Sequence, residues 1–223
     1  MSPGPDPSLT GLRFVVTAGG TREPIDPVRF IGNRSSGKMG NELAAAAIRH
    51  GAEVTLVTAG VLPAAQPGLT VWVVATADDM YAALRSTLEG ARVLIMAAAV
   101  ADWHPSRVAA HKLKKGASTL TLVLVPTVDI LSALRDDEIA AGVFKVGFAA
   151  ETDNVIDNAR AKLDAKHLDL VIANDVSRED IGMGSDHNEV TVIGRNGLQQ
   201  HIPRAPKSVV ADSIVRIIAR SLR

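Results

Sequence analysis

The sequence predicts a Rossmann-like α/β fold with a doubly wound, mostly parallel sheet and a C-terminal antiparallel hairpin. Short apolar runs alternate with amphipathic stretches long enough to form helices, which is the strand–helix order of parallel sheets. Hydrophobic residues make up 47% of the chain but aromatic residues only 3%. The core must therefore consist of Ala, Val, Ile and Leu, which suits strands covered by helices on both faces.

The expected strands are β-branched apolar runs, each bounded by polar, Gly or Pro residues. They cover residues 14–18, 52–58, 70–75, 92–97, 119–125, 144–148 and 168–173. The expected helices cover residues 36–50, 77–88, 129–135, 155–166 and 206–221. Gly51 is a natural stop for the first helix, and Pro206 is a natural start for the last.

Three segments do not follow the strand–helix pattern. Strands 190–193 and 198–202 flank an Asn196-Gly197 turn and form the expected hairpin. Residues 21–35 form an unusually long polar connection, and connections of this length tend to be functional or disordered. Residues 1–12 contain three Pro and are interpreted as a flexible leader, so that residues 13–223 form a single domain.

The composition argues against several classes of partner. Basic and acidic residues balance at 24 each, so a nucleic-acid partner is not expected. No apolar run reaches the roughly 18 residues that span a bilayer, so no membrane partner is expected. The chain has no Cys, which excludes thiolate metal sites and fits a reducing compartment. The N-terminal residues do not form a secretory signal, so we expect a cytoplasmic protein. The six His show no metal-binding spacing, and no protein-held metal site is expected.

Residues 32–39 nearly match the phosphate-binding P-loop. Met39 stands where the Mg²⁺-binding hydroxyl is needed, and the segment does not directly follow a strand, so we reject that interpretation. Ser36, Gly37 and Lys38 nevertheless enter a helix with free N–H groups and a cation, which suits a phosphate. An ordinary serine N-cap fits the same residues equally well.

Polar residues follow two of the predicted strands. Asp102 comes after the small residues 97–101, at the edge of a parallel sheet where ligands bind. Its carboxylate suits a ribose hydroxyl or an amine, although it could also cap a turn. Asn174 follows strand 168–173 and either lines the same cleft or forms an Asx turn.

Several basic and aromatic residues can likewise be interpreted either as ligand-binding or as purely structural. The basic loop 111–115 is either a solvated surface or a loop that closes over phosphates and neutralises their charge. Lys162 and Lys166 lie four residues apart and therefore share one helical face. Phe148 could stack on a base, but core packing is the simpler interpretation.

Taken together, the segments resemble those of phosphopantothenate–cysteine ligases. The resemblance is carried by residues 17–40 (TAGGTREPIDPVRFIGNRSSGKMG), 97–102 (AAAVAD), 112–116 (KLKKG), 146–152 (VGFAAET), 159–166 (ARAKLDAK) and 173–177 (ANDVS). It extends over nearly the whole chain from residue 13. There is one departure: Pro126-Thr127-Val128 stands where many relatives have Lys-Asn-Pro, which leaves the contacts of that loop open.

The resemblance implies a reaction in two steps. The carboxylate of 4′-phosphopantothenate attacks the α-phosphate of CTP, and the amine of L-cysteine then displaces CMP from the acyl-cytidylate. Lys112 is implied to promote the first step by offsetting negative charge. Asn33 is implied to hold and polarise the acyl intermediate in the second step, with Arg29 supporting that site.

The resemblance also implies a set of binding residues. Those for CTP are Met96, Ala97, Ala98, Asp102, Lys112, Val128, Asp129, Ile130, Leu131, Phe148, Lys162 and Lys166. Those for the substrates are Asn33, Ser36, Gly37, Lys38, Ala99 and Asn174. Members of the family use Mg²⁺ and form homodimers with the substrate site near the subunit boundary. They often form the C-terminal half of a protein that also carries a flavin-dependent decarboxylase; that half is not in this sequence, so no flavin is expected.

Two other functions are compatible with the architecture. An NAD(P)-dependent oxidoreductase needs G-x-G-x-x-G after the first strand and an acid after the second. The sequence has Ala18-Gly19-Gly20 and Thr58-Ala59-Gly60 at these places, so neither feature is present. A non-catalytic nucleotide-binding module would bind CTP but would have no need of Asn33 or Lys112.

Overall fold

The computed structural model describes residues 7–116, 119–178, 180–182 and 184–223. Its helices and 3₁₀ turns are η1 (Pro7–Leu9), α1 (Lys38–Arg49), α2 (Ala77–Thr87), α3 (Ile130–Arg135), η2 (Glu138–Ala140), α4 (Val155–Ala165) and α5 (Lys207–Ser221). Its strands are β1 (Arg13–Ala18), β2 (Arg22–Pro24), β3 (Phe30–Gly32), β4 (Glu53–Thr58), β5 (Leu69–Val73), β6 (Val93–Met96), β7 (Trp103–Pro105), β8 (Leu124–Pro126), β9 (Phe144–Glu151), β10 (Leu170–Asp175), β11 (His187–Gly194) and β12 (Gln199–Pro206).

The predicted Rossmann-like fold is confirmed. Eight strands form one sheet in the order β12-β11-β10-β9-β6-β1-β4-β5. All neighbours from β10 to β5 pair in parallel, and β11 and β12 add the antiparallel hairpin at one edge. The chain moves outward from β1 through β4 to β5 and then returns to place β6 on the other side of β1. A topological switch point therefore lies between β1 and β6, where ligands bind in open α/β sheets.

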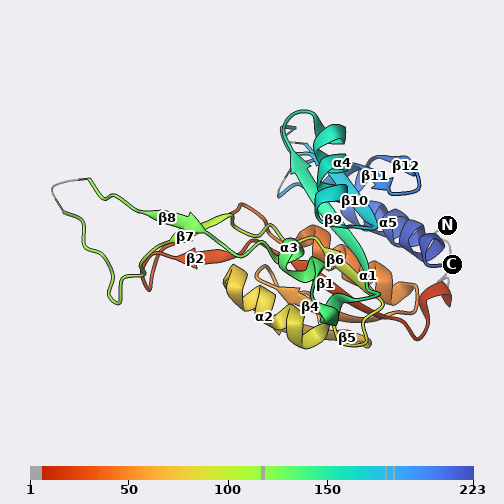
Figure 1. The fold of residues 1–223 in the computed structure, drawn as a ribbon, viewed down its shortest axis with the longest axis horizontal. Coiled ribbons are helices and arrows are strands. Elements are labelled where there is room, and N and C mark those ends of the chain that lie inside the picture. The colour runs from red at the N-terminus through yellow and green to blue at the C-terminus, as the bar shows by residue number, and fades with distance from the viewer. Residues whose placement is uncertain (1–6, 117–118, 179, 183) are drawn as a thin grey trace.

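Helices cover both faces of the sheet, as the Ala-rich composition predicts (Figure 1). On one face α1 and α5 pack together, and buried side chains such as Leu43 and Ile214 join the core there. On the other face α2, α3 and α4 contribute Met80, Leu134 and Leu163. Small alanines such as Ala46 and Ala47, both 0% exposed, let α1 approach the sheet closely.

Two short hairpins were not predicted, and together they form an arm that projects beyond the sheet (Figure 1). The polar connection 21–35 contains the antiparallel pair β2–β3, and β7 pairs with β8 further along the chain. The predicted strand at residues 119–125 is wrong except at its last two residues, which lie in β8. Because β6 and β9 pair directly, the sheet has no place for a strand between them, and Leu120 remains 62% exposed on the arm.

The predicted N-terminal leader, residues 1–12, is longer than the structure supports. Residues 1–6 lie outside the described part of the chain, but Leu9 is 1% exposed and its N–H donates to the His50 carbonyl at 3.0 Å. The core therefore begins before residue 13, because the turn η1 places an apolar side chain under α1. Among the described residues, no helix is both long and apolar enough to cross a bilayer.

Candidate functional site

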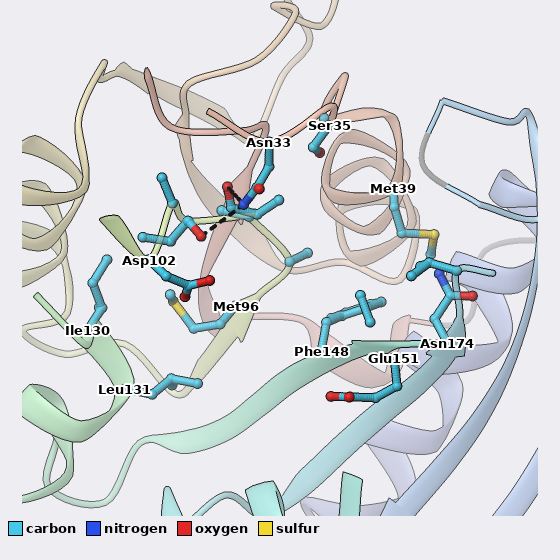
Figure 2. A pocket seen from close by; sticks show the side chains of 18 of the residues that line it. Asn33, Ser35, Met39, Met96, Asp102, Ile130, Leu131, Phe148, Glu151 and Asn174 are labelled. Carbon is cyan, nitrogen blue, oxygen red and sulfur yellow. Dashed lines mark hydrogen bonds between the residues drawn. The ribbon is translucent and has the colours of Figure 1, made fainter. Parts of the chain in front are cut away.

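A large cavity lies at the carboxyl edge of the parallel strands, over the switch point between β1 and β6. Its volume is about 700 Å³, and its walls come from the segments that follow β3, β6, β8, β9 and β10. Figure 2 shows Asn33 and Ser35 on one wall, Asp102 and Met96 on a second, and Phe148 and Asn174 on a third. The position of this cavity is the one that the doubly wound topology predicts.

Most of the site residues predicted from the sequence line this cavity. They are Asn33, Ser36, Gly37, Lys38, Met96, Ala97, Ala98, Ala99, Asp102, Val128, Asp129, Ile130, Leu131, Phe148, Lys162, Lys166 and Asn174. Arg29 and Lys112 do not line it. The structure thus gathers residues that are widely separated in sequence, but it leaves two of the three predicted catalytic residues outside.

Asn33 is anchored to the segment that follows β6. Its Nδ2 donates to the carbonyls of Ala99 at 3.2 Å and Val100 at 3.0 Å (Figure 2). Because an amide nitrogen has two hydrogens, these bonds occupy both and leave Oδ1 as a free acceptor. Asp102 lies two residues beyond Val100 on the same segment, and no described side chain donates a hydrogen bond to its carboxylate. Both groups are therefore available to a ligand.

Three threonines hold the segment after β6 in place. The hydroxyls of Thr17 and Thr21 accept the N–H groups of Ala98 at 3.1 Å and Ala101 at 2.8 Å. Thr127 donates its hydroxyl to the Ala101 carbonyl at 2.5 Å. These bonds satisfy backbone groups that a regular strand would pair, so the segment can line a cavity without unpaired polar atoms at these positions.

Glycines allow three loops to touch beneath the cavity. Gly19 follows β1, Gly37 precedes α1, and Gly60 follows β4. A Cβ on Gly19 would lie 2.2 Å from the Gly60 nitrogen, and one on Gly60 would lie 3.2 Å from the Gly37 Cα. Gly19 and Gly37 also have φ values of 83° and 85°, a conformation that L side chains rarely adopt. Glycine at these positions brings the N-terminus of α1 against the end of β1.

One wall of the cavity is built around a buried ammonium group. Lys162 Nζ donates to the carbonyl of Phe148 at 2.7 Å. Burial lowers the pKa of Lys162, and the nearby carboxylate of Glu151 offsets only part of that effect. Lys166 pairs with Asp129, the N-cap of α3, and donates to Ser132 at 2.8 Å. Both predicted lysines therefore fix backbone and helix positions beside Phe148 rather than lying on a solvated face.

The opposite end of the cavity carries excess positive charge. Lys38 pairs with Asp186 at 2.6 Å, and Lys207 donates to the carbonyl of Ser185. Burial and then the charge of Lys38 lower the pKa of Lys207, which is 8% exposed. The N-cap residue of α1, Gly37, has no side chain, and the Ser36 hydroxyl accepts the N–H of Lys38 at 3.5 Å. The following N–H groups of the first turn add positive potential. This end of the cavity is suited to a phosphate group.

Several lining residues were not predicted from the sequence. They are Ser35, Met39, Val100, Ala101, Pro126, Thr127, Ala150, Glu151, Val176, Gly182, Gly184, Asn188 and Lys207. Many of them adjoin predicted residues and could have been included by extending each motif. Asn188 and Lys207 are different, because they lie on β11 and at the start of α5, where no sequence pattern indicates a ligand.

Arg29 and Lys112 lie together on the arm. Arg29 Nη2 donates to the carbonyl of Leu113, the residue after Lys112, at 2.6 Å. Lys112 lies in the loop between β7 and β8, and that loop extends away from the sheet (Figure 1). The two residues are thus held as neighbours, but apart from the cavity of the same chain.

A comparison with protein families matches residues 9–222 to the DNA/pantothenate metabolism flavoprotein C-terminal domain. The coenzyme A biosynthesis bifunctional protein CoaBC of Bacillus subtilis (strain 168) is 43% identical over 212 residues, which are 95% of this chain and 52% of that protein. The corresponding protein of Escherichia coli (strain K12) is 44% identical over 195 residues, 85% of this chain and 47% of that protein. The chain thus spans about half the length of these bifunctional relatives.

Among solved structures, the crystal structure of the C-terminal domain of a CoaBC protein superposes with a TM-score of 0.82. The two chains are 36% identical, and the match covers 97% of this chain and 98% of the other. The likeness therefore extends over the entire C-terminal domain rather than over a shared nucleotide-binding core.

Proposed function

Because the chain belongs to the family of the DNA/pantothenate metabolism flavoprotein C-terminal domain, we propose that it ligates 4′-phosphopantothenate to L-cysteine at the expense of CTP. The products are phosphopantothenoylcysteine, CMP and pyrophosphate, and the reaction belongs to coenzyme A biosynthesis. The bifunctional relatives bear that pathway in their names, and this chain covers about half of their length.

The observation that supports the proposal most strongly is the composition of the cavity. Asn33 and Asp102 both line it, Phe148 and Lys162 form one wall, and a cationic end is provided by Lys38 and Lys207. A nucleotide needs an apolar surface for its base, acceptors for its ribose, and cations for its phosphates. The cavity offers all three within about 700 Å³.

The first step requires neutralisation of charge on a triphosphate. A carboxylate oxygen of phosphopantothenate forms a bond to the α-phosphorus, and the bond from that phosphorus to the pyrophosphate oxygen breaks. Free N–H groups at the start of α1 and the ammonium groups of Lys38 and Lys207 would bind phosphate oxygens. Lys112 would offset the charge that develops on the α-phosphate.

In the second step, the amine of cysteine needs a hydrogen-bond acceptor that orients it. The nitrogen of cysteine forms a bond to the acyl carbon, CMP leaves with the bonding electrons, and the amine loses a proton. Both Nδ2 hydrogens of Asn33 are bound to the carbonyls of Ala99 and Val100. Its free Oδ1 would accept an N–H from the incoming amine and orient the nitrogen toward the acyl carbon.

Lys112 reaches a nucleotide in this proposal only across a dimer. The arm that carries it leads away from its own cavity and exposes apolar side chains, including Trp103 at 51% and Val123 at 65%. A second copy of the chain would cover these side chains and insert its own Arg29 and Lys112 into the cavity of the first. A homodimer with shared sites is therefore part of the proposal.

Mg²⁺ fits the same site. The ion needs only one or two carboxylates beside phosphate oxygens, and Asp102 and Glu151 both line the cavity. It would neutralise charge on the triphosphate.

We further propose that the protein is cytoplasmic. We also propose that a flavin-dependent decarboxylase, in the same protein or in another, acts on a neighbouring intermediate of the same pathway.

The test is the release of pyrophosphate. The protein is mixed with CTP, Mg²⁺ and 4′-phosphopantothenate without cysteine, and pyrophosphate is measured by a coupled enzyme assay. We expect release that depends on phosphopantothenate and that is abolished in Lys112→Gln. The absence of release would contradict the proposed chemistry and leave a nucleotide-binding module as the alternative. Release from CTP alone would contradict it as well, because it would indicate hydrolysis of CTP rather than activation of phosphopantothenate.

A further inference from the structure

A buried carboxylate connects the turn between β2 and β3 to the lysine-bearing loop. Asp26 is 2% exposed, and its Oδ1 accepts the N–H groups of Val28 at 2.8 Å and Arg29 at 2.9 Å. These two bonds close the turn locally, in the manner of an Asx turn. They use only one of the two carboxylate oxygens, so closure of the turn does not account for the other.

The second oxygen binds a segment that is distant in sequence. Asp26 Oδ2 accepts the N–H of Leu113 at 3.0 Å and lies 3.4 Å from Arg29 Nη1. Arg29 Nη2 in turn donates to the carbonyl of Leu113 at 2.6 Å. Both backbone polar groups of Leu113 are therefore held by this pair, and Leu113 lies between Lys112 and Lys114.

A further backbone contact supports the same attachment. The N–H of Ala109 donates to the carbonyl of Ile25 at 3.0 Å, one residue before Asp26. The loop is thus bound to the turn at Ala109 and again at Leu113. These two contacts restrain the chain between them, whereas residues 114–116 have no such anchor among the hydrogen bonds of the described residues.

The charge of Asp26 is stabilised where it lies. Burial raises the pKa of this carboxyl, but the N–H groups of Val28, Leu113 and Arg29 and the charge of Arg29 outweigh it, so the pKa is held below its ordinary value. A buried charge is tolerated only when its hydrogen-bond partners are all present. Loss of any partner therefore weakens the whole attachment.

We propose that Asp26 is a positioning residue that holds Arg29 and Lys112 together as one unit on the arm. Asp26 has no role in touching substrate; it acts through the two residues that it fixes. This inference rests on the proposed function of Lys112, but the attachment itself is a property of the arm. It explains why the carboxylate of Asp26 is buried in the turn between β2 and β3, with partners on both the turn and the loop.

The first experiment measures the attachment by limited proteolysis with trypsin, with cleavage sites mapped by mass spectrometry. We expect Asp26→Ala to be cut after Lys112 or Lys114 about tenfold faster than the wild type, because a charge-assisted hydrogen bond is lost. Asp78→Asn, which changes an exposed carboxylate on α2, should be cut at the wild-type rate. Equal rates in Asp26→Ala and wild type would overturn the proposal.

The second experiment measures whether the attachment serves Lys112. Asp26→Asn keeps the size of the side chain, and in assays that include cysteine, so that the enzyme turns over, we expect it to lower kcat for pyrophosphate release about tenfold while the KM for CTP changes less than about threefold. A wild-type kcat, or a rise in KM alone, would contradict positioning through Lys112.

The two experiments separate this inference from the proposed function. If the wild type releases no pyrophosphate, the proposed function fails, yet the tryptic pattern still decides whether Asp26 anchors the loop. If release occurs but Asp26 variants behave like wild type in both assays, only the positioning role fails. Far-UV circular dichroism verifies that each variant is folded. If Asp26→Ala does not fold, Asp26→Asn replaces it in the proteolysis experiment.

Discussion

The packing of glycines beneath the cavity leads to a quantitative prediction for Gly19→Ala. The new Cβ would lie 2.2 Å from the Gly60 nitrogen, a backbone atom that has no side-chain freedom with which to move away. Overpacking of this kind costs about 1–3 kcal/mol. The φ of 83° adds a left-handed conformation that costs an L-residue about 1–2 kcal/mol. We expect the free energy of unfolding to fall by about 2–5 kcal/mol.

Gly142→Ala is the matched control for this variant. Gly142 also has a positive φ, 71°, but a Cβ there would meet nothing within 4 Å. The free energy of unfolding of Gly142→Ala should therefore fall only by the cost of the left-handed backbone conformation, about 1–2 kcal/mol. Urea unfolding followed by circular dichroism gives both values, provided that the m-values agree with that of the wild type.

The difference between the two variants isolates the contact between the loops. A loss of 1 kcal/mol in the free energy of unfolding lowers the melting temperature by about 2–4 °C in a domain of this size, so Gly19→Ala should melt about 4–20 °C below the wild type. If Gly19→Ala and Gly142→Ala lose the same stability, glycine is not required at residue 19 by close approach, and the explanation of how α1 is held against β1 is wrong.

Three further predictions concern other parts of the structure. Glu23, which is 4% exposed, accepts the N–H of Ala77 at the start of α2, so Glu23→Ala should lower the free energy of unfolding by about 1–3 kcal/mol; wild-type stability in urea would contradict this. Hydrogen bonds from Thr76 lower the pKa of Asp79, so the wild type should be more stable than Asp79→Asn above about pH 4 and lose that advantage as the pH falls through the lowered pKa; a constant difference across pH would refute it. Asn33→Asp removes the donor that fixes the side chain to the carbonyls of Ala99 and Val100 and so displaces the acceptor; it should accumulate acyl-cytidylate, detectable by mass spectrometry, whereas product formation at the normal rate would count against the role of Asn33.

The central sheet was predictable because its strands are buried on both faces. Runs such as residues 14–18 and 92–97 are apolar without alternation, and Gly or polar residues mark their ends. The arm was not predictable in the same way. Its strands have three residues each, three of them end in Pro, and only two of their twelve residues are buried, so neither burial nor periodicity distinguishes them from loops.

The walls of the cavity followed from the sequence because small and polar residues come directly after apolar strands, and parallel strands end at one edge of a sheet. Asp102 was identified in this way, and Asn33 was identified by the family resemblance. Lys207 was not, because it reaches the cavity from the last helix through the packing of α5 against α1. That contact depends on tertiary structure and leaves no local pattern. The place of Lys112 on a projecting arm likewise depends on contacts with the turn at Asp26.

The claim that a second copy completes the cavity is tested most directly by co-expressing the Asn33→Asp and Lys112→Gln variants, so that mixed dimers form. The formation of phosphopantothenoylcysteine is then measured. If Asn33 and Lys112 of one site come from different copies, each mixed dimer regains one intact site, and about a quarter of wild-type activity should return. If both residues of a site come from the same copy, every site in the mixture remains defective, and no activity above that of the separate variants would appear.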